Sequence, residues 1–396
     1  MGTPASSVLL QALQPWRRLE QIKTPLLASS SAVESRYHLM EETNVGSKAV
    51  DLGQLAGLPM ALEAAIELNV IEILANSAGR ESKLLSSSQI VEQIPARNPK
   101  AAAVTLERIL RFLASNSVLT STRNEKGEML YGLTPVCEYF LPNKDGVSLA
   151  TLVTFANDKV MMQSWHHLKE AVLTEGSVPP FNIAHDGMNA FEYNARDERF
   201  NKLFNDAMFN HSTLVLRQVL ENYKEFERLE EIVDVGGGIG ASLKMITSRY
   251  PHIKGTNFDL PHVIAEAPPC PGVKHVAGDM FEGVPTGEAI FMKWILHDWD
   301  DERCKRVLKN CWRALPETGK VISVEFILPE DITNDPICRQ IMYADLFMLA
   351  VNEGGKERTL VEFEGLAKES GFAAIRPFPC SGGLSVLEFH KKPLDD

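Results

Sequence analysis

The chain has 396 residues, 44% hydrophobic and 23% charged, which is typical of a soluble globular protein with room for two or three domains. Lys and Arg number 40 against 52 Asp and Glu, and the net charge of −12 argues against a nucleic acid as the main partner. No apolar run reaches the roughly 18 residues of a membrane-spanning helix, and the six cysteines contain no C-x-x-C pair. We therefore predict a cytoplasmic protein with reduced thiols, no zinc site and no membrane partner.

The first 45 residues show little hydrophobic periodicity, and we predict a loose N-terminal arm over residues 1–45. The beginning of the chain lacks the long apolar segment of a signal peptide. It does fit the short pattern M-G-x-x-x-S, through Gly2 and Ser6, that precedes N-myristoylation. Because so short a pattern recurs by chance, myristoylation of Gly2 stays an open alternative.

Residues 46–150 are predicted to form a small, mainly helical domain. Apolar residues at helical spacing predict a helix over residues 55–75, and two more helical patterns follow before a hairpin with its turn at residues 124–128. This order of elements is that of a winged helix, which serves either nucleic acid binding or dimerisation. The third helix carries Arg108 and Arg111 between core leucines, so we favour dimerisation.

The segment 151–225 is predicted to be largely helical and to begin a second domain over residues 151–396. It is rich in aromatic residues and methionine: Phe155, Met161, Met162, Trp165, Phe191, Tyr193, Phe200, Phe204, Met208 and Phe209. Such residues most often form plain core. Since aromatic faces and thioethers also stack on rings, the wall of a pocket for a flat ligand is the alternative.

From residue 229 onward, short apolar segments alternate with helical patterns. The segments are EEIVDVGG, IKGTNFDLP, VKHVAGDMF, AIFMKWILHDW and GKVISVEFILP, and a final hairpin ends in LSVLEFHKK. This alternation predicts an α/β fold with a parallel sheet and helices on both faces. The fourth strand is predicted to run as far as His297.

The glycine-rich segment VDVGGGIGA predicts a tight turn between the first strand and its helix. Gly236, Gly238 and Ala241 satisfy the dinucleotide pattern G-x-G-x-x-G/A, although a plain strand-helix turn explains it as well. Asp259 ends the next strand, where a carboxylate can accept both hydroxyls of a ribose. NAD and S-adenosylmethionine satisfy these features equally.

Asp279 and Met280 end the third strand and favour S-adenosylmethionine over NAD. The acid can accept the exocyclic amine of an adenine while Met280 packs on the ring face. Three successive strand ends then form one site for a nucleoside, and only the first turn suits a pyrophosphate. A nicotinamide oxidoreductase stays the more remote alternative.

His297 is the candidate general base, because the end of the fourth strand opens into the same crevice. Glu325 lies among apolar residues of the fifth strand and needs a partner there. Glu357 lies in a glycine-containing loop before a helix whose capping box is predicted at Thr359 and Glu362. Two acids near one imidazole can fix its tautomer and stabilise its charged form.

Six motifs in this order resemble those of plant small-molecule O-methyltransferases of the caffeic acid type: VDVGGGIG, FDLPHV, GDMF, KWILHDWDDERC, LPETGKVISVEFILP and NEGGKERT. Several stretches also resemble relatives that act on benzylisoquinoline alkaloids. The resemblance implies a homodimer with a winged-helix-like dimerisation domain over residues 46–150 and a class I, Rossmann-like methyltransferase domain over residues 151–396. It implies methyl transfer from S-adenosylmethionine to a plant phenol, for example caffeate or 5-hydroxyferulate, with S-adenosylhomocysteine as the product.

The resemblance also implies roles for single residues. His297 is the expected base, with Glu325 and Glu357 beside it, and Asp298 is expected to bind an oxygen next to the reacting one. The expected donor contacts are Gly236, Asp259, Asp279, Met280 and Lys293. The expected acceptor pocket consists of Phe200, Phe204, Met208, His211, Phe347, Met348 and Asn352. The sequence contains no Asp, Glu and His set with convincing metal spacing, so we predict a reaction without a metal.

Four positions depart from the caffeic acid type. Glu353 follows Asn352 where that type usually has proline, and Asn194 replaces a frequent histidine. Phe155 and Ala156 replace a Met-Asn pair that faces the tail of the substrate in that type. These changes favour a phenol with a less polar tail than caffeate, or another scaffold such as an alkaloid, a stilbene or a flavonoid.

Overall fold

The computed structural model describes residues 45–77, 84–176 and 178–394. The predicted N-terminal arm and Gly2 therefore lie outside the described residues. The short first unit, up to Leu58, contains the helix Val45–Gln54, and the second unit contains residues 59–396. Among the described helices none is by itself long and apolar enough to cross a membrane, although the bent pair Val45–Gln54 and Gly57–Glu67 meets that test of length and composition together.

The predicted helices and hairpin of the winged-helix-like part are present. They are α3 (Gly57–Glu67), α4 (Val70–Ser77), α5 (Ser87–Val91), α6 (Pro99–Ser115), β1 (Leu119–Arg123) and β2 (Met129–Leu133). The single helix predicted over residues 55–75 is wrong in one respect, because Asn69 has a left-handed φ of 54° and separates α3 from α4. Asn98 caps α6 by accepting the N–H of Ala101, with Pro99 at the first helical position.

The segment that precedes the sheet is largely helical, as predicted. It contains η2 (Pro135–Phe140), α7 (Ala150–Asn157), α8 (Lys159–Trp165), α9 (Leu168–Leu173), α10 (Pro180–Ala184), α11 (Ala190–Arg196), α12 (Glu198–Asn222) and η3 (Glu225–Arg228). Most of its aromatic residues pack in one cluster together with Phe347, Met348, Ala350 and Val351, whereas Phe191 is exposed. Both interpretations of these aromatics, core and pocket wall, therefore concern the same cluster.

The sheet has seven strands in the order β5-β4-β3-β6-β7-β9-β8. They are β3 (Glu231–Val235), β4 (Lys254–Asp259), β5 (Val273–Ala277), β6 (Ala289–Lys293), β7 (Lys320–Phe326), β8 (Ala374–Pro379) and β9 (Leu384–His390). The first five are parallel, and β9 pairs antiparallel with both β7 and β8, as the final hairpin predicts. The chain order reverses between β3 and β6, and ligands bind at such a point in open α/β sheets.

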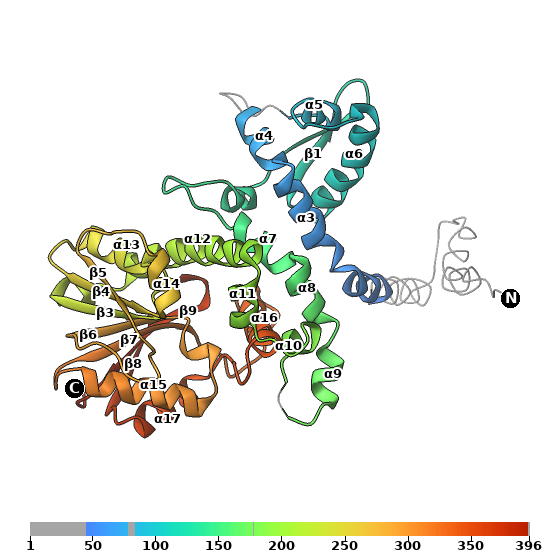
Figure 1. The fold of residues 1–396 in the computed structure, drawn as a ribbon. Helices are drawn as coiled ribbons and strands as arrows, with labels where there is room; N and C mark the ends of the chain where they lie inside the picture. The colour runs from blue at the N-terminus through green and yellow to red at the C-terminus, as the bar shows by residue number, and fades with distance from the viewer. Residues whose placement is uncertain (1–44, 78–83, 177, 395–396) are drawn as a thin grey trace, which may run out of the picture. The chain divides into compact units, whose positions relative to one another are not determined.

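Helices cover both faces of this sheet (Figure 1). The helices that follow β3 are α13 (Ala241–Arg249), α14 (Pro261–Glu266), α15 (Asp301–Ala314), α16 (Pro336–Val351) and α17 (Leu360–Glu369), and the 3₁₀ turns are η4 (Leu296–Asp298) and η5 (Ser381–Gly383). One buried cluster joins the sheet to α12 and α13, and another joins it to α15 and α17. The rigid sheet thus presents the carboxyl ends of its parallel strands at one edge.

The fourth strand ends earlier than predicted. β6 ends at Lys293, and Trp294 then adopts a left-handed φ of 55°. This conformation is rare for an aromatic residue and turns the chain out of the sheet. His297 consequently lies in the 3₁₀ turn η4, four residues beyond the strand.

Candidate active site

The glycine turn after β3 has room for a ligand on one side only. A Cβ on Gly237 would lie 2.1 Å from Oδ1 of Asn257 and 2.7 Å from Oδ2 of Asp234, so no side chain fits there. Gly238 has a φ of 59°, and nothing lies within 4 Å of a Cβ built on it. At position 237 only glycine fits, because any Cβ would collide with neighbouring side chains. At position 238 glycine is favoured by the positive φ, and the space beside it is open.

The acidic residues predicted to contact a nucleoside follow adjacent strands. Asp259 ends β4 and accepts the N–H groups of Gly238 and Leu260 at 2.8 and 2.7 Å. Burial raises the pKa of this carboxyl, although both hydrogen bonds oppose the rise. Asp279 follows β5 and accepts the N–H of Phe281 at 2.8 Å, which leaves its other oxygen for a ligand. Gly236, Asp259 and Asp279 thus lie along one edge of the sheet.

Asp234, which is buried, and Lys293, which is partly buried, lie behind the glycine turn. Burial lowers the pKa of Lys293 to about 8, although nearby carboxylates oppose this change. Burial raises the pKa of Asp234 to about 7 against the effect of Lys293. Among the described residues, Oδ2 of Asp234 has no hydrogen-bond partner, so a ligand with an amino group would satisfy it. The sequence prediction missed Asp234, although an acid inside an apolar strand had identified Glu325.

His297 is buried, with 7% of its surface exposed, and its two ring nitrogens face different acids. Nδ1 lies 2.9 Å from Oε1 of Glu357, and Nε2 lies 3.6 Å from Oδ1 of Asp298. Burial by itself lowers the pKa of His297. The carboxylates of Asp298, Glu357 and Glu325 outweigh burial and raise this pKa to about 9. The hydrogen bond with Glu357 holds the ring orientation and directs Nε2 away from that acid.

Glu325 supports the backbone before His297 rather than the ring itself. Its Oε1 accepts the N–H of Leu296 at 3.2 Å and the hydroxyl of Ser323 at 2.8 Å. Burial raises the pKa of Glu325 to about 7, and the charge of His297 opposes that rise. The prediction that both acids lie near one imidazole therefore holds in space, with a direct contact only from Glu357 among the hydrogen bonds described.

The same three residues have a spacing that could hold a cation. One ligand atom each from His297, Glu325 and Glu357 lies within 4.8 Å of the others. Nδ1 of His297 is already hydrogen-bonded to Oε1 of Glu357, and Oε1 of Glu325 already accepts two hydrogen bonds. These contacts fit an imidazole held by carboxylates, and activity in the presence of a chelator distinguishes the two interpretations.

The predicted acceptor residues come together from three helices. The ring of Phe155 on α7 lies 5.6 Å from those of Phe200 and Phe204 on α12 and 6.4 Å from that of Phe347 on α16. Met208 and Met348 pack in the same cluster. In the sequence, Phe155 is both one of the aromatic residues of this segment and a departure from the caffeic acid type, and the structure places it at the centre of this cluster.

Asn352 connects the aromatic cluster to the turn that contains His297 and Asp298. Its Nδ2 donates to Oδ1 of Asp298 at 2.6 Å and lies 3.8 Å from the sulfur of Met348. Burial raises the pKa of Asp298 to about 6, while the charge of His297 opposes this. Asp298 is thereby held beside Nε2 of His297, where the resemblance places an oxygen of the acceptor.

His211 packs against Trp294, before the turn that contains His297, rather than in the aromatic cluster. Its ring stacks on Trp294 with a centroid distance of 4.4 Å and an angle of 23°. Burial, together with Lys293, lowers the pKa of His211 to about 3, so the ring stays neutral. The ring centroids of Trp294 and His297 are in turn 5.7 Å apart. No pattern in the sequence signalled Trp294.

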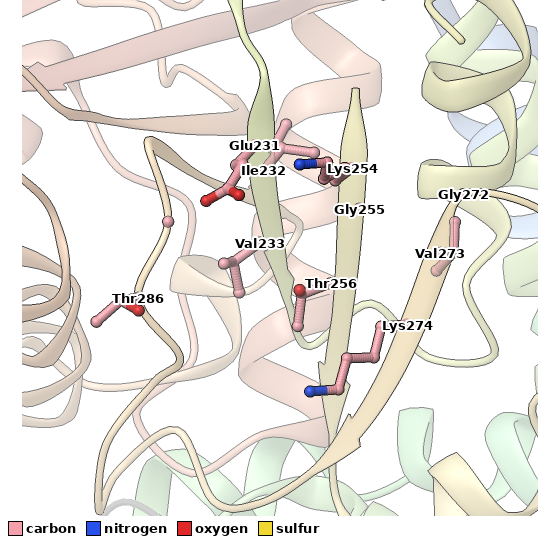
Figure 2. A pocket seen from close by; sticks show the side chains of 11 residues that line it. Glu231, Ile232, Val233, Lys254, Gly255, Thr256, Gly272, Val273, Lys274 and Thr286 are labelled. Carbon is pink, nitrogen blue, oxygen red and sulfur yellow. The ribbon is translucent and has the colours of Figure 1, made fainter. Parts of the chain in front are cut away.

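A hollow of about 450 Å³ lies where β3, β4 and β5 begin, away from these strand ends. Figure 2 shows Glu231, Lys254 and Val273 at the start of the three strands. Parallel strands place their amino ends at the edge opposite to their carboxyl ends. This hollow is therefore separate from the acids and glycines described above.

Residues 165–373 match the O-methyltransferase domain, and residues 52–143 match the O-methyltransferase dimerisation domain. Desmethyl-yatein O-methyltransferase of Sinopodophyllum hexandrum is 60% identical over 87% of this chain and 97% of its own length. The chain belongs to the plant O-methyltransferase family. A caffeic acid 3-O-methyltransferase of Eucalyptus gunnii is 52% identical, covering 89% and 95% of the two chains, and (S)-scoulerine 9-O-methyltransferase of Coptis japonica is 46% identical, covering 94% and 98%.

Solved structures agree with this assignment. Human N-acetylserotonin methyltransferase in complex with SAM superposes with a TM-score of 0.73 at 22% identity, over 93% of this chain and 100% of its own, and shows the fold. The structure of LaPhzM has a TM-score of 0.71 at 28% identity, over 87% and 99% of the chains. The class I methyltransferase fold is confirmed, and the enzyme is an S-adenosylmethionine-dependent O-methyltransferase. The nicotinamide alternative receives no support.

Proposed function

We propose that this O-methyltransferase methylates a phenolic hydroxyl and that His297 is the general base. The observation that carries the proposal is the 2.9 Å contact between Nδ1 of His297 and Glu357, which leaves Nε2 beside Asp298. A phenol has a pKa near ~10, so transfer of its proton to a free imidazole costs roughly 5 kcal/mol. The carboxylates around His297 raise its pKa to about 9 and thereby reduce the remaining cost to the order of 1 kcal/mol.

For the methyl donor we propose a site formed by the strand ends. Gly236, Asp259, Asp279, Met280 and Lys293 are its residues, and the unpartnered oxygen of buried Asp234 supports the assignment. When bound, S-adenosylmethionine supplies the methyl group on a sulfonium. The enzyme itself orients the acceptor oxygen and removes its proton, and such positioning contributes much of the rate enhancement.

For the acceptor we propose a flat phenol with an uncharged tail. The wall of Phe155, Phe200, Phe204 and Phe347 offers ring faces, and aromatic rings pack well on such faces. A carboxylate that enters this wall loses water without gaining a donor from Ala156. The relatives' names mention desmethyl-yatein, caffeic acid and (S)-scoulerine, so these compounds and phenolic aldehydes are the acceptors to test.

We further propose that residues 46–150 dimerise two copies of the chain and that residues 151–396 form the catalytic domain. The dimerisation domain match supports this assignment. A cytoplasmic location is also proposed, and it is supported by the cysteines, all six of which lie in described residues and are free. Light scattering tests the dimer, and cell fractionation tests the cytoplasmic location.

The variant His297→Gln tests the base. Its kcat for methyl transfer to phenols should fall by ~10² or more, because general base catalysis contributes at least that much. Calorimetric affinity for S-adenosylhomocysteine should stay unchanged, since His297 faces the acceptor. A variant with more than about a tenth of the wild-type kcat would rule out this role.

A further inference from the structure

Arg358 is fully buried, although arginine is almost never fully buried without partners. It follows Glu357 directly and precedes the capped helix α17. A guanidinium in the interior requires several acceptors with good geometry, because removing the charge from water is costly. Its partners therefore indicate what the side chain organises.

All the strong contacts of Arg358 go to the segment that contains the proposed base. Nη1 donates to the carbonyl of Leu296 at 2.7 Å, and Nη2 donates to the carbonyl of Trp299 at 2.7 Å. Nε and Nη2 also donate to Oδ1 of Asp301 at 3.0 and 2.8 Å. The two carbonyls lie on either side of the pair His297 and Asp298, so one planar group holds both ends of that pair.

The residues before Arg358 contact the same segment. The N–H of Lys356 donates to the carbonyl of His297 at 2.9 Å, and Glu357 contacts Nδ1 of the His297 ring. The backbone of the 356–358 segment is itself anchored. The N–H of Glu357 donates to Asp345 at 2.9 Å, and the carbonyl of Arg358 accepts the N–H of Leu328 at 2.9 Å. Residues 356–358 are thus hydrogen-bonded both to the turn that contains His297 and to the neighbouring residues Asp345 and Leu328.

We propose that Arg358 is a positioning residue that sets the distance between His297 and Glu357 by holding the carbonyls of Leu296 and Trp299. The inference rests on the proposed role of His297 as the base. A shift of the turn by one ångström would lengthen the Nδ1 contact and displace Nε2 from Asp298. Displacements of this size can reduce rates by about 100-fold.

The variant Arg358→Lys tests the inference, because lysine keeps the charge but cannot span two carbonyls and a carboxylate. We expect kcat to fall by about 10- to 100-fold while affinity for S-adenosylhomocysteine changes less than about twofold. A longer distance to Glu357 stabilises the imidazolium form of His297 less and therefore lowers its pKa. The midpoint of the curve of kcat/KM against pH should consequently move to lower pH. The other charges facing this site, on Asp298, Glu325 and Lys293, are unchanged.

Tyr223→Phe is the matched control. It removes a buried hydroxyl that donates to Glu388 at 2.5 Å, near the opposite ends of the strands, and should lower Tm without moving the pH midpoint. An Arg358→Lys enzyme whose kcat falls only in proportion to the folded fraction, with an unchanged pH midpoint, would overturn the inference.

If Arg358→Lys does not fold, Asp301→Glu provides a second test, because it keeps the charge but moves the carboxylate that binds Arg358. It should show the same fall in kcat and the same shift of the pH midpoint, and the absence of both would equally overturn the inference. Activity retained by His297→Gln refutes the base instead, so the two failures are distinguishable.

Discussion

Replacing Glu357 with Gln should change how the proposed base titrates while keeping its shape. Glutamine retains an oxygen that can accept the hydrogen bond from Nδ1 of His297, but it carries no charge. The pair is buried, and the two atoms are 2.9 Å apart, so the lost charge is poorly screened. The substitution therefore isolates the electrostatic part of the interaction.

The expected magnitude follows from the pKa of His297. The rise from 6.5 to about 9 corresponds to about 3 kcal/mol in favour of the charged ring, after burial has acted in the opposite direction. Asp298, Glu357 and Glu325 share this effect. Removing one adjacent opposite charge should lower the apparent pKa by about 1–3 units. Because the neutral ring is the base, activity rises with pH through this pKa, and the variant should reach a lower plateau at a lower pH.

The assay is kcat/KM for a phenol from pH 6 to pH 10.5, measured with labelled methyl donor. Glu353→Gln removes a charge from the exposed part of the same loop and should leave the curve unchanged. Stability provides a second test, since a raised histidine pKa stabilises the fold below pH 6.5 and this contribution is lost as pH rises through about 9. Glu357→Gln should thus lower Tm more at pH 6 than at pH 10. An apparent pKa equal to that of the wild type would refute the reasoning.

Two further predictions concern metal and acceptor. A chelator should leave activity intact, because hydrogen bonds already engage His297, Glu325 and Glu357, and loss that is restored by Mg²⁺ would show that their 4.8 Å spacing holds a cation. The wild type should prefer phenolic aldehydes over caffeate, and Ala156→Asn should raise relative kcat/KM for caffeate by about a hydrogen bond, on the order of 1 kcal/mol. A wild type that prefers caffeate would contradict this prediction.

Local signals were sufficient for much of the fold. The parallel strands, the glycine turn and the terminal hairpin follow from alternation and turn residues. The predicted capping box of Thr359 and Glu362 is also present, because it depends on residues within one helical turn. Acids at successive strand ends indicated the donor site, since parallel strands carry their ends to one edge.

The sequence by itself indicated most residues of the candidate site, although it missed Asp234 and assigned His211 to the acceptor pocket, and the tertiary structure decided how these residues act on one another. The early end of β6 depends on Trp294, whose unusual backbone conformation accompanies stacking on His211 from another helix. Arg358 bonds to residues 57 to 62 positions away, so no periodicity or local motif could reveal its partners. The division between Glu357, which contacts the imidazole, and Glu325, which holds the backbone, likewise depends on ångström distances between separate strands and loops. Such distances arise only when the packed core brings those segments together, and they decide the charge on His297.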